Sequence, residues 1–275
     1  MKKIAKLIII ALILEIITTG IKPFDAVAKA YFVNPEEEIV INCGTLEILH
    51  EKDSDKRASI ASLTKIVTAI TALENFDVSK EIIVTDEMVG VEGSSIYLKK
   101  GEVLSVEELL YGLMMRSGND AATAIALSVS GSVGEFSKLM NETAQKAGAV
   151  NSNFVNPHGL EEKEHYSTAK DVALITAYAL KNQSFSKIVG TKKKVIRNTI
   201  EDYDRVLINK NKLLYSYDGC DGVKTGYTKV SGRCLASSAT RNGVRLVCVV
   251  INCADTYGRT KQLFDEAFKK YVLVP

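Results

Sequence analysis

The stretch Ala61-Ser62-Leu63-Thr64-Lys65 opens an apolar segment that keeps helical spacing to about Ala72. It predicts a helix on which Ser62 and Lys65, three residues apart, share one face one turn apart. A serine hydroxyl becomes a nucleophile when a base takes its proton, and a lysine amine with a lowered pKa can be that base. The first turn of a helix also has spare backbone N–H groups that can polarise a carbonyl. The pattern indicates nucleophilic catalysis, although Ser-x-x-Lys occurs three times in the chain.

Two further motifs make the interpretation specific. Ser117-Gly118-Asn119 and Lys224-Thr225-Gly226 each occur once, 55 and then 107 residues further along the chain. Ser-x-x-Lys, Ser-x-Asn and Lys-Thr-Gly in this order are the signature of class A β-lactamases and penicillin-binding proteins. The spacing is that of one large catalytic domain.

Four ordered segments resemble the low-molecular-mass D-alanyl-D-alanine carboxypeptidases, and the resemblance runs from about Ala30 to the end of the chain. The segments are Ala61–Lys65, Ser117–Ala122 (SGNDAA), Asn156–Leu160 (NPHGL) and Asp221–Thr228 (DGVKTGYT). The resemblance implies an exported serine enzyme that removes the terminal D-alanine from peptidoglycan pentapeptides through an acyl-enzyme. It also implies that β-lactams, which imitate this substrate, acylate the same serine.

The resemblance assigns the catalytic steps to three residues. Ser62 would attack the carbonyl between the two D-alanines, and Lys65 would be the general base. Lys65 must then be partly neutral, which burial and a second nearby cation both favour. Ser117 would relay a proton toward the leaving amine.

Substrate binding falls to five further residues by the same resemblance. Asn119 would hydrogen-bond the substrate backbone. Lys224 would attract the terminal carboxylate and lower the pKa of the base, while Thr225 hydrogen-bonds that carboxylate. Gly226 would allow close approach to the strand backbone, and the N–H of Tyr227 would be an oxyanion donor together with that of the nucleophile.

Two other residues have open interpretations. Lys210 falls near a basic residue that relatives direct at the carboxylate, but a solvated lysine fits the pattern equally well. His158 suggests a Ser-His-Asp site, yet the chain has no Gly-x-Ser-x-Gly motif. A turn histidine bonded to backbone is therefore the preferred interpretation of Asn156–Gly159. The sequence has no His-Glu-x-x-His motif either, so we expect neither a metal nor another cofactor.

Two alternatives to the carboxypeptidase are a class A-like β-lactamase and a non-catalytic peptidoglycan-binding module. A class A-like β-lactamase needs a positioned glutamate for deacylation, and no Glu-x-x-Leu-Asn segment lies between Asn119 and Lys224. A non-catalytic peptidoglycan-binding module need not keep Ser62 and Lys65. Labelling by penicillin would separate such a module from both enzymes.

Composition limits the partners. The 275 residues are 46% hydrophobic with a formal charge of +2, enough to bury a substantial core in one large or two closely packed domains. Residues 1–30 hold five lysines and two acids, and the remainder has 30 basic and 31 acidic residues. Because no basic excess remains to neutralise phosphates, composition disfavours a nucleic-acid partner.

Residues 1–30 have the pattern of an export signal. Three early lysines precede the apolar run Leu7–Leu14, and small-residue cleavage sites end at Ala28 or Ala30. The alternative is an uncleaved anchor, but Glu15 interrupts the run, and even Leu7–Ile21 is shorter than the roughly 20 residues of a spanning helix. We expect an exported protein at the outer face of the cytoplasmic membrane, in the wall or secreted.

The mature part, residues 31–275, is then the catalytic domain. We expect it to lack the C-terminal β-rich domain and amphipathic anchor helix of many relatives. Its five cysteines are an odd number and include no Cys-x-x-Cys pair. Cys234, Cys248 and Cys253 lie in strand-like apolar runs and are expected to be buried, whereas Cys220 has no assigned role.

The pattern of elements predicts an α/β (α+β) fold. A hairpin is expected from Ile39–Asn42 and Leu46–His50, helices from Ser62 to about Val189, and strands after Lys192. The last two strands flank Asn242-Gly243, a tight-turn signal, and a helix over 256–271 closes the chain. Strands at both ends predict one antiparallel sheet with a helical lobe inserted. The resemblance implies five strands and a DD-peptidase/β-lactamase-like fold, with the site in a cleft between the lobes.

Overall fold

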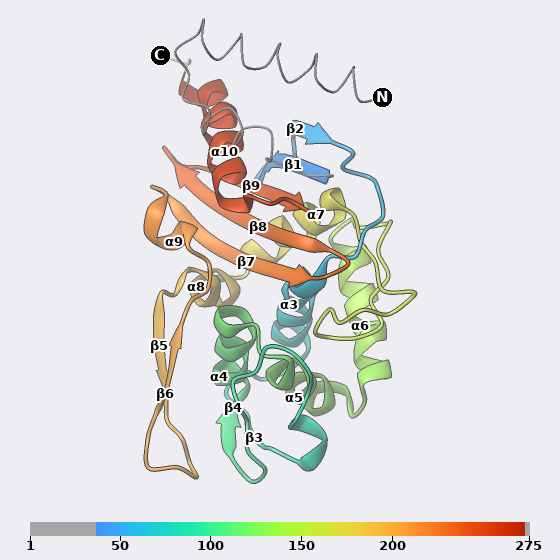
Figure 1. The fold of residues 1–275 in the computed structure, drawn as a ribbon, viewed down its shortest axis with the longest axis vertical. Helices are drawn as coiled ribbons and strands as arrows, with labels where there is room; N and C mark the ends of the chain where they lie inside the picture. Colours follow the sequence, from blue (N-terminus) through green and yellow to red (C-terminus); the bar gives the residue numbers. More distant parts are fainter. Residues whose placement is uncertain (1–36, 273–275) are drawn as a thin grey trace, which may run out of the picture. The chain divides into compact units, whose positions relative to one another are not determined.

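The computed structural model describes residues 37–272, and its centre is an antiparallel sheet of five strands (Figure 1). The strand order is β2-β1-β9-β8-β7, so both ends of the described chain contribute, as predicted. The strands are β1 (Glu37–Asn42), β2 (Ile48–Lys52), β7 (Cys220–Thr228), β8 (Gly232–Arg241) and β9 (Val244–Ile251). Strand β7 lies at one edge of this sheet, beside the helical lobe.

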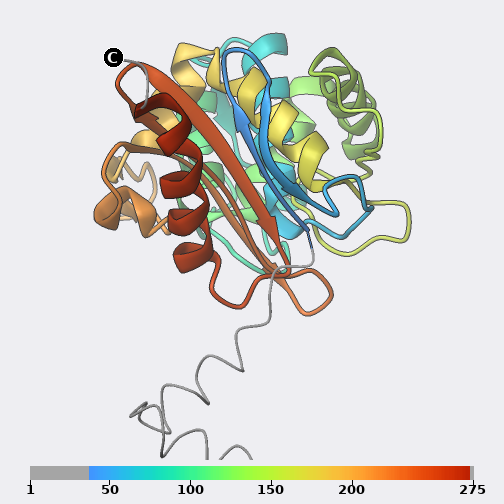
Figure 2. The same cartoon turned by 90° about the horizontal axis from the view of Figure 1, so that it is seen from above.

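The sheet is covered on both faces, and this explains its apolar central strands. Along β9, Val247, Val249 and Ile251 belong to the core shared with the helical lobe, while Leu246, Cys248 and Val250 face the other way. Helix α10 (Thr256–Val272) covers that second face, and α7 (Ala169–Leu180) packs on the first (Figure 2). A strand buried on both faces reads as a continuous apolar run rather than an alternating one.

The predicted turns form with small shifts. Asn242 and Gly243 have φ values of 49° and 79°, the two left-handed residues that a type I′ hairpin turn requires. The first hairpin also forms, but its second strand starts at Ile48 rather than Leu46. Leu46 lies inside the turn at φ 63°, and the Asn42 side chain accepts hydrogen bonds from the backbone N–H groups of Gly44 and Thr45 in the same turn.

The helical lobe surrounds one central helix, α3 (Lys65–Asn75), in which every residue from Lys65 to Ala72 is buried. Around it pack α5 (Asn119–Ser130), α6 (Val133–Lys146), α7 and α8 (Gln183–Gly190), while α4 (Val106–Tyr111) packs on α5 and α8. Side chains at Ser105, Ser132, Thr168 and Asn182 cap four of these helices by accepting a backbone N–H of the first turn.

Sequence reasoning missed several short elements. These are the ladder of β3 (Glu81–Ile83) with β4 (Val103–Ser105), the strand β6 (Arg205–Ile208), which pairs with the expected strand β5 (Lys193–Ile196), the short helix α9 (Leu213–Ser216), and a π-helical turn at Gly112–Arg116. These elements have three to five residues each, which are too few for a periodic pattern to stand out.

The cysteines behave as small core residues. All five are free thiols; Cys234, Cys248 and Cys253 are buried, as expected, and Cys220 is half-buried. Burial raises the pKa of Cys234 and of Cys253 to about 11. The predicted export signal falls outside the described residues. Within 37–272, no helix combines the length and apolar character that a membrane crossing needs.

Candidate active site

The nucleophile candidate lies on a tight turn that two glycines support. A 3₁₀ turn, Ala61–Thr64, precedes α3, and Ala61 has φ 47°, a left-handed conformation that is costly for alanine. A Cβ at Gly159 would overlap the carbonyl oxygen of Ala61, and one at Gly226 would lie 3.2 Å from the backbone nitrogen of Ser62. The glycine of Lys-Thr-Gly therefore lets β7 approach this turn closely.

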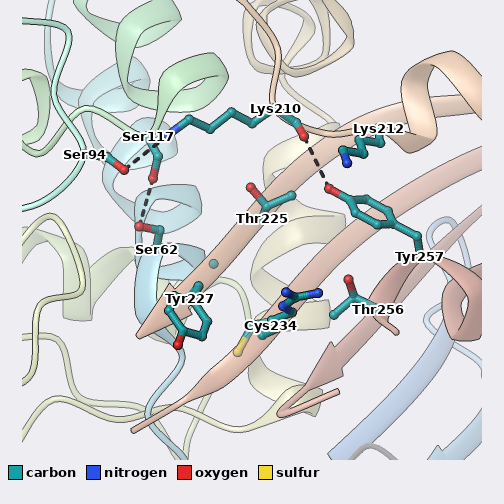
Figure 3. Close-up of a pocket in the computed structure, with 12 residues that line it drawn as sticks. Ser62, Ser94, Ser117, Lys210, Lys212, Thr225, Tyr227, Cys234, Thr256 and Tyr257 are labelled. Atoms are coloured by element: carbon teal, nitrogen blue, oxygen red, sulfur yellow. Dashed lines mark hydrogen bonds between the residues drawn. The ribbon is translucent and has the colours of Figure 1, made fainter. Parts of the chain in front are cut away.

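The three predicted catalytic side chains meet at this turn, and Figure 3 shows two of them, Ser62 and Ser117, in contact. The Nζ of Lys65 lies 3.0 Å from the Oγ of Ser62, and Ser117 Oγ donates to the same oxygen at 2.9 Å. Ser117 reaches it from the end of the π-helical turn, in a left-handed conformation at φ 65°. Both distances are within the range for direct proton transfer.

Lys65 is a buried amine with three partners. Besides Ser62, its Nζ donates to Oδ1 of Asn119 at 2.7 Å and to the carbonyl oxygen of His158 at 2.6 Å. Burial, and then the charges of Lys224 and Lys210, hold the pKa of Lys65 well below its ordinary value, against a smaller opposite effect of Asp120. A lysine in this setting can be a neutral base near neutral pH.

Asn119 lies at the start of α5, but its side chain does not cap that helix. Gly118 is the cap residue and makes no side-chain cap bond, while Asn119 is the first residue of α5. Its amide is used instead in the site, because Nδ2 donates to the carbonyl of Glu92 while Oδ1 accepts from Lys65. An amide nitrogen has two N–H groups, so one remains for another acceptor.

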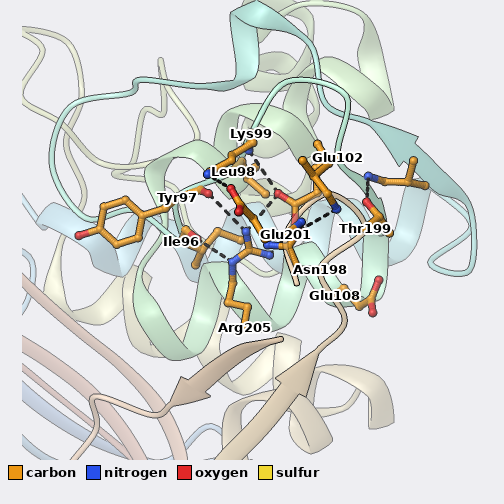
Figure 4. A network of polar contacts seen from close by, with 12 residues as sticks. Ile96, Tyr97, Leu98, Lys99, Glu102, Glu108, Asn198, Thr199, Glu201 and Arg205 are labelled. Atoms are coloured by element: carbon orange, nitrogen blue, oxygen red, sulfur yellow. Dashed lines mark hydrogen bonds and ion pairs between the residues drawn. The ribbon is translucent and has the colours of Figure 1, made fainter. Parts of the chain in front are cut away.

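The loop around Ser94 forms the lobe-side wall, and two buried carboxylates fix it. The carboxylate of Asp120 accepts the backbone N–H groups of Ile96 and Leu98. On the other side, Glu102 forms a bidentate pair with Arg205 at 2.7 and 3.1 Å, with the Glu102 side chain fully buried (Figure 4).

Arg205 also donates its Nε to the carbonyl of Ile96 at 2.7 Å. Arg205 belongs to β6, and Lys210 follows shortly after this strand. The network therefore connects the loop around Ser94 to the segment that carries Lys210.

Strand β7 supplies the other wall. Lys224 is buried, and its Nζ donates to the carbonyl of Thr225 at 2.8 Å. Burial, and then the charge of Lys210, lower the pKa of Lys224 to about 7. Thr225, Gly226 and the exposed Tyr227 line the cavity in front of the nucleophile.

Lys210 is exposed and lines the cavity beside the nucleophile, a position that is compatible with both of its sequence interpretations. Its Nζ donates to Ser94 Oγ at 3.2 Å, and burial with the charge of Arg116 lowers its pKa. It lines a cavity of about 700 Å³ that begins at Ser62 and extends over β7 (Figure 3). The other lining residues are Ser94, Ser117, Lys212, Thr225, Gly226, Tyr227, Arg233, Cys234, Thr256 and Tyr257.

His158 acts through its backbone. Its ring Nδ1 accepts the N–H of Leu160 at 3.2 Å, and burial lowers the pKa of the ring to about 4. His158 is therefore a turn histidine, as the sequence predicted. What the sequence did not predict is that its backbone carbonyl accepts a hydrogen bond from Lys65. Within the described residues, no group of three or more His, Cys, Asp or Glu side chains is arranged to hold a metal.

Comparison with known proteins agrees with this geometry. The sequence profile of the D-alanyl-D-alanine carboxypeptidase family matches residues 25–255. D-alanyl-D-alanine carboxypeptidase DacF of Bacillus subtilis is 37% identical over 245 residues, covering 86% of this chain and 63% of that protein. The D-alanyl-D-alanine carboxypeptidase of Streptomyces sp. strain K15 is 35% identical over 251 residues, covering 85% and 86% of the two chains.

Comparison with solved structures supports the same family. The crystal structure of the Streptomyces K15 DD-transpeptidase superposes with a TM-score of 0.81 at 30% identity, covering 86% of this chain and 97% of that one. The matches span 63%, 64% and 58% of the lengths of the first three curated relatives.

Proposed function

The chain belongs to the D-alanyl-D-alanine carboxypeptidase family of serine peptidases, and from this premise we propose that it removes the terminal D-alanine from peptidoglycan stem peptides ending in D-Ala-D-Ala. The observation that carries the proposal is the contact of Ser62 Oγ with both Lys65 Nζ, at 3.0 Å, and Ser117 Oγ, at 2.9 Å. One group can take the serine proton while the other gives a proton to the leaving amine.

Acylation begins when Ser62 Oγ attacks the carbonyl between the two D-alanines and its proton passes to neutral Lys65. The negative oxygen that forms accepts the backbone N–H groups of Ser62 and Tyr227. Ser117 relays the proton that Lys65 has taken to the amide nitrogen as the C–N bond breaks, so free D-alanine leaves, an ester remains on Ser62 and Lys65 is neutral again. Water then attacks this ester, with Lys65 again taking the proton.

Binding of the substrate uses both walls. Lys224 and Lys210 supply positive charge for the terminal carboxylate, and the Thr225 hydroxyl hydrogen-bonds it. The free N–H of Asn119 donates to the substrate backbone. Gly226 leaves the edge of β7 open for the substrate. No cofactor is required, because side chains and backbone supply each proton transfer and charge.

The β-lactamase alternative is less well supported. A deacylating glutamate would have to lie beside Ser62, but the lining of the cavity, within the described residues, includes no acidic side chain. Glu161, which follows the Asn-Pro-His-Gly-Leu segment, instead accepts hydrogen bonds from Ser59 and Thr228. β-Lactams should therefore bind as slowly released acylating inhibitors.

The direct test is release of D-alanine from a purified pentapeptide, measured by a D-amino-acid oxidase assay. The account expects D-alanine and tetrapeptide in equal amounts. Rapid penicillin hydrolysis without D-alanine release would support the β-lactamase instead, and neither activity would favour a binding module.

We also propose that residues 1–30 are a cleaved export signal and that residues 31–275 form the catalytic domain, which acts at the outer face of the membrane or in the wall. The early lysines, apolar run and small-residue sites support this. Terminal sequencing of the exported protein should begin between Ala28 and Tyr31. A membrane-bound product that keeps Met1 would favour an anchor.

A further inference from the structure

Arg233 lies on the strand beside Lys-Thr-Gly and on the face of Thr225. In the β7–β8 ladder, Tyr227 is opposite Arg233 and Thr225 is opposite Leu235. Side chains on directly opposite residues, and on residues two apart, share a face. Thr225 and Arg233 are therefore diagonal neighbours, about 7–8 Å apart at the backbone, which a long side chain easily spans.

The guanidinium of Arg233 contributes little to holding the fold together. Arg205, Arg241, Arg245 and Arg259 each pair with a carboxylate within 4 Å. Within the described part of the chain, the one hydrogen bond of the Arg233 side chain is a long one, from Nη1 to the carbonyl of Ala254 at 3.4 Å. The residue is exposed and lines the cavity that begins at Ser62.

Arg233, Lys210 and Lys212 line the same cavity, and together they form a cationic wall. Lys210 and Lys212 come from the segment before α9, and Tyr257 from the start of α10 donates to the carbonyl of Lys210 at 3.3 Å (Figure 3). No acidic side chain lines this cavity within residues 37–272. Such a wall attracts an anion and holds it more strongly as the solvent is excluded.

The cationic groups of the site lose their positive charge at different pH values. The pKa of Lys224 is about 7, and the pKa of Lys210 is also below its ordinary value. A guanidinium stays protonated at every pH where proteins work, and its planar fork matches a carboxylate. The planar fork of Arg233 is thus the part of this wall whose shape best fits a carboxylate.

We propose that Arg233 reads the terminal carboxylate of the substrate, reaching from β8 across β7 to the anion that Thr225 binds. This inference rests on the proposed carboxypeptidase function. Thr225 and Arg233 hold the carboxylate from one face of the strand, and Lys210 holds it from the lobe side. Arg233 is a specificity residue in this arrangement, because it selects a free acid and takes no part in the bond that breaks.

The test uses two matched thioester substrates, N-acyl-D-alanyl mercaptoacetate and the corresponding mercaptoacetamide, which differ only in the terminal charge. The measured quantity is the ratio of kcat/KM for the acid to kcat/KM for the amide, at pH 6 and at pH 8.5. Arg233→Gln is compared with Arg233→Lys, and Lys229→Gln is the matched control, since Lys229 is an exposed cation outside the cavity in the turn between β7 and β8.

We expect Arg233→Gln to lower this ratio about tenfold at pH 8.5 and about threefold at pH 6, since a charged hydrogen bond is lost while the lysines still compensate at low pH. Arg233→Lys should keep most of the ratio at pH 6. Lys229→Gln should match the wild type at both values.

An unchanged ratio in Arg233→Gln would overturn the inference, as would equal losses on acid and amide, which indicate a structural role. The proposed function fails separately, if the wild type releases no thiol from either substrate and takes up no penicillin.

Discussion

Lys224→Gln tests how charge is used in the site, because the side chain keeps its approximate length and loses its cation. Lys224 is 2% exposed, so a carboxylate near it is largely removed from water. A charged hydrogen bond of this kind is worth about 2–3 kcal/mol, which corresponds to a loss of roughly 30- to 150-fold in kcat/KM for a peptide ending in a free acid. The same peptide as an ester or amide should lose much less.

The variant should also move the pH profile. The charge of Lys224 disfavours the protonated form of Lys65 and contributes to its lowered pKa. Removing that charge raises the pKa of Lys65, and activity depends on the neutral amine, so the acidic limb of the profile moves to higher pH. The wild type should in addition lose affinity for the acid above pH 7, as Lys224 itself, with a pKa of about 7, gives up its proton.

The assay is kcat/KM for the acid and the amide from pH 5 to 10, in wild type and Lys224→Gln. Two effects then separate, because carboxylate binding affects only the acid and the shifted limb affects both substrates. Equal losses on both substrates with an unmoved acidic limb would refute the reasoning, since Lys224 would then neither bind the carboxylate nor tune the base.

Two further predictions concern stability. Arg205→Met leaves the fully buried Glu102 carboxylate without its cation, so the free energy of unfolding in urea should fall by about 3 kcal/mol. Lys100→Met, which removes an ion pair whose two side chains are 67% and 72% exposed, should change it by under about 0.5 kcal/mol; similar losses would contradict the account. Lys224→Met should be more stable than wild type, because Lys224 has a pKa of about 7 when folded. Its unfolded pKa is near 10.4, so the advantage should grow by about 1.4 kcal/mol per unit as pH falls from about 10 to 7 and level off below; a pH-independent difference would argue against a buried titrating lysine.

Local sequence patterns predicted the parts of the fold that depend on neighbours in the chain. The Asn242-Gly243 turn, the apolar strands beside it and the helix over 256–271 all follow from short-range rules. The meeting of Ser62, Lys65 and Ser117 was predictable only because three rare motifs occur together. No periodicity could have placed Ser117 against the nucleophile.

Contacts between segments that lie far apart in the sequence could not be predicted from local patterns. The side chain of Asn119 contacts Lys65 and Glu92, which are 54 and 27 residues away in the sequence, and no local pattern predicts either contact. Lys210 meets Ser94 across 116 residues, and nothing local separates it from a solvated lysine. Arg233 carries no motif at all, and the register of β7 with β8 is what brings it near Thr225.

The most direct test of the central claim is the mass of the intact protein after brief exposure to benzylpenicillin, followed by peptide mapping. The account predicts a single adduct with the full mass of the drug, carried by the peptide that contains Ser62, and no adduct on a folded Ser62→Ala variant. An adduct at another residue, or one that persists in Ser62→Ala, would contradict the assignment of Ser62 as the nucleophile.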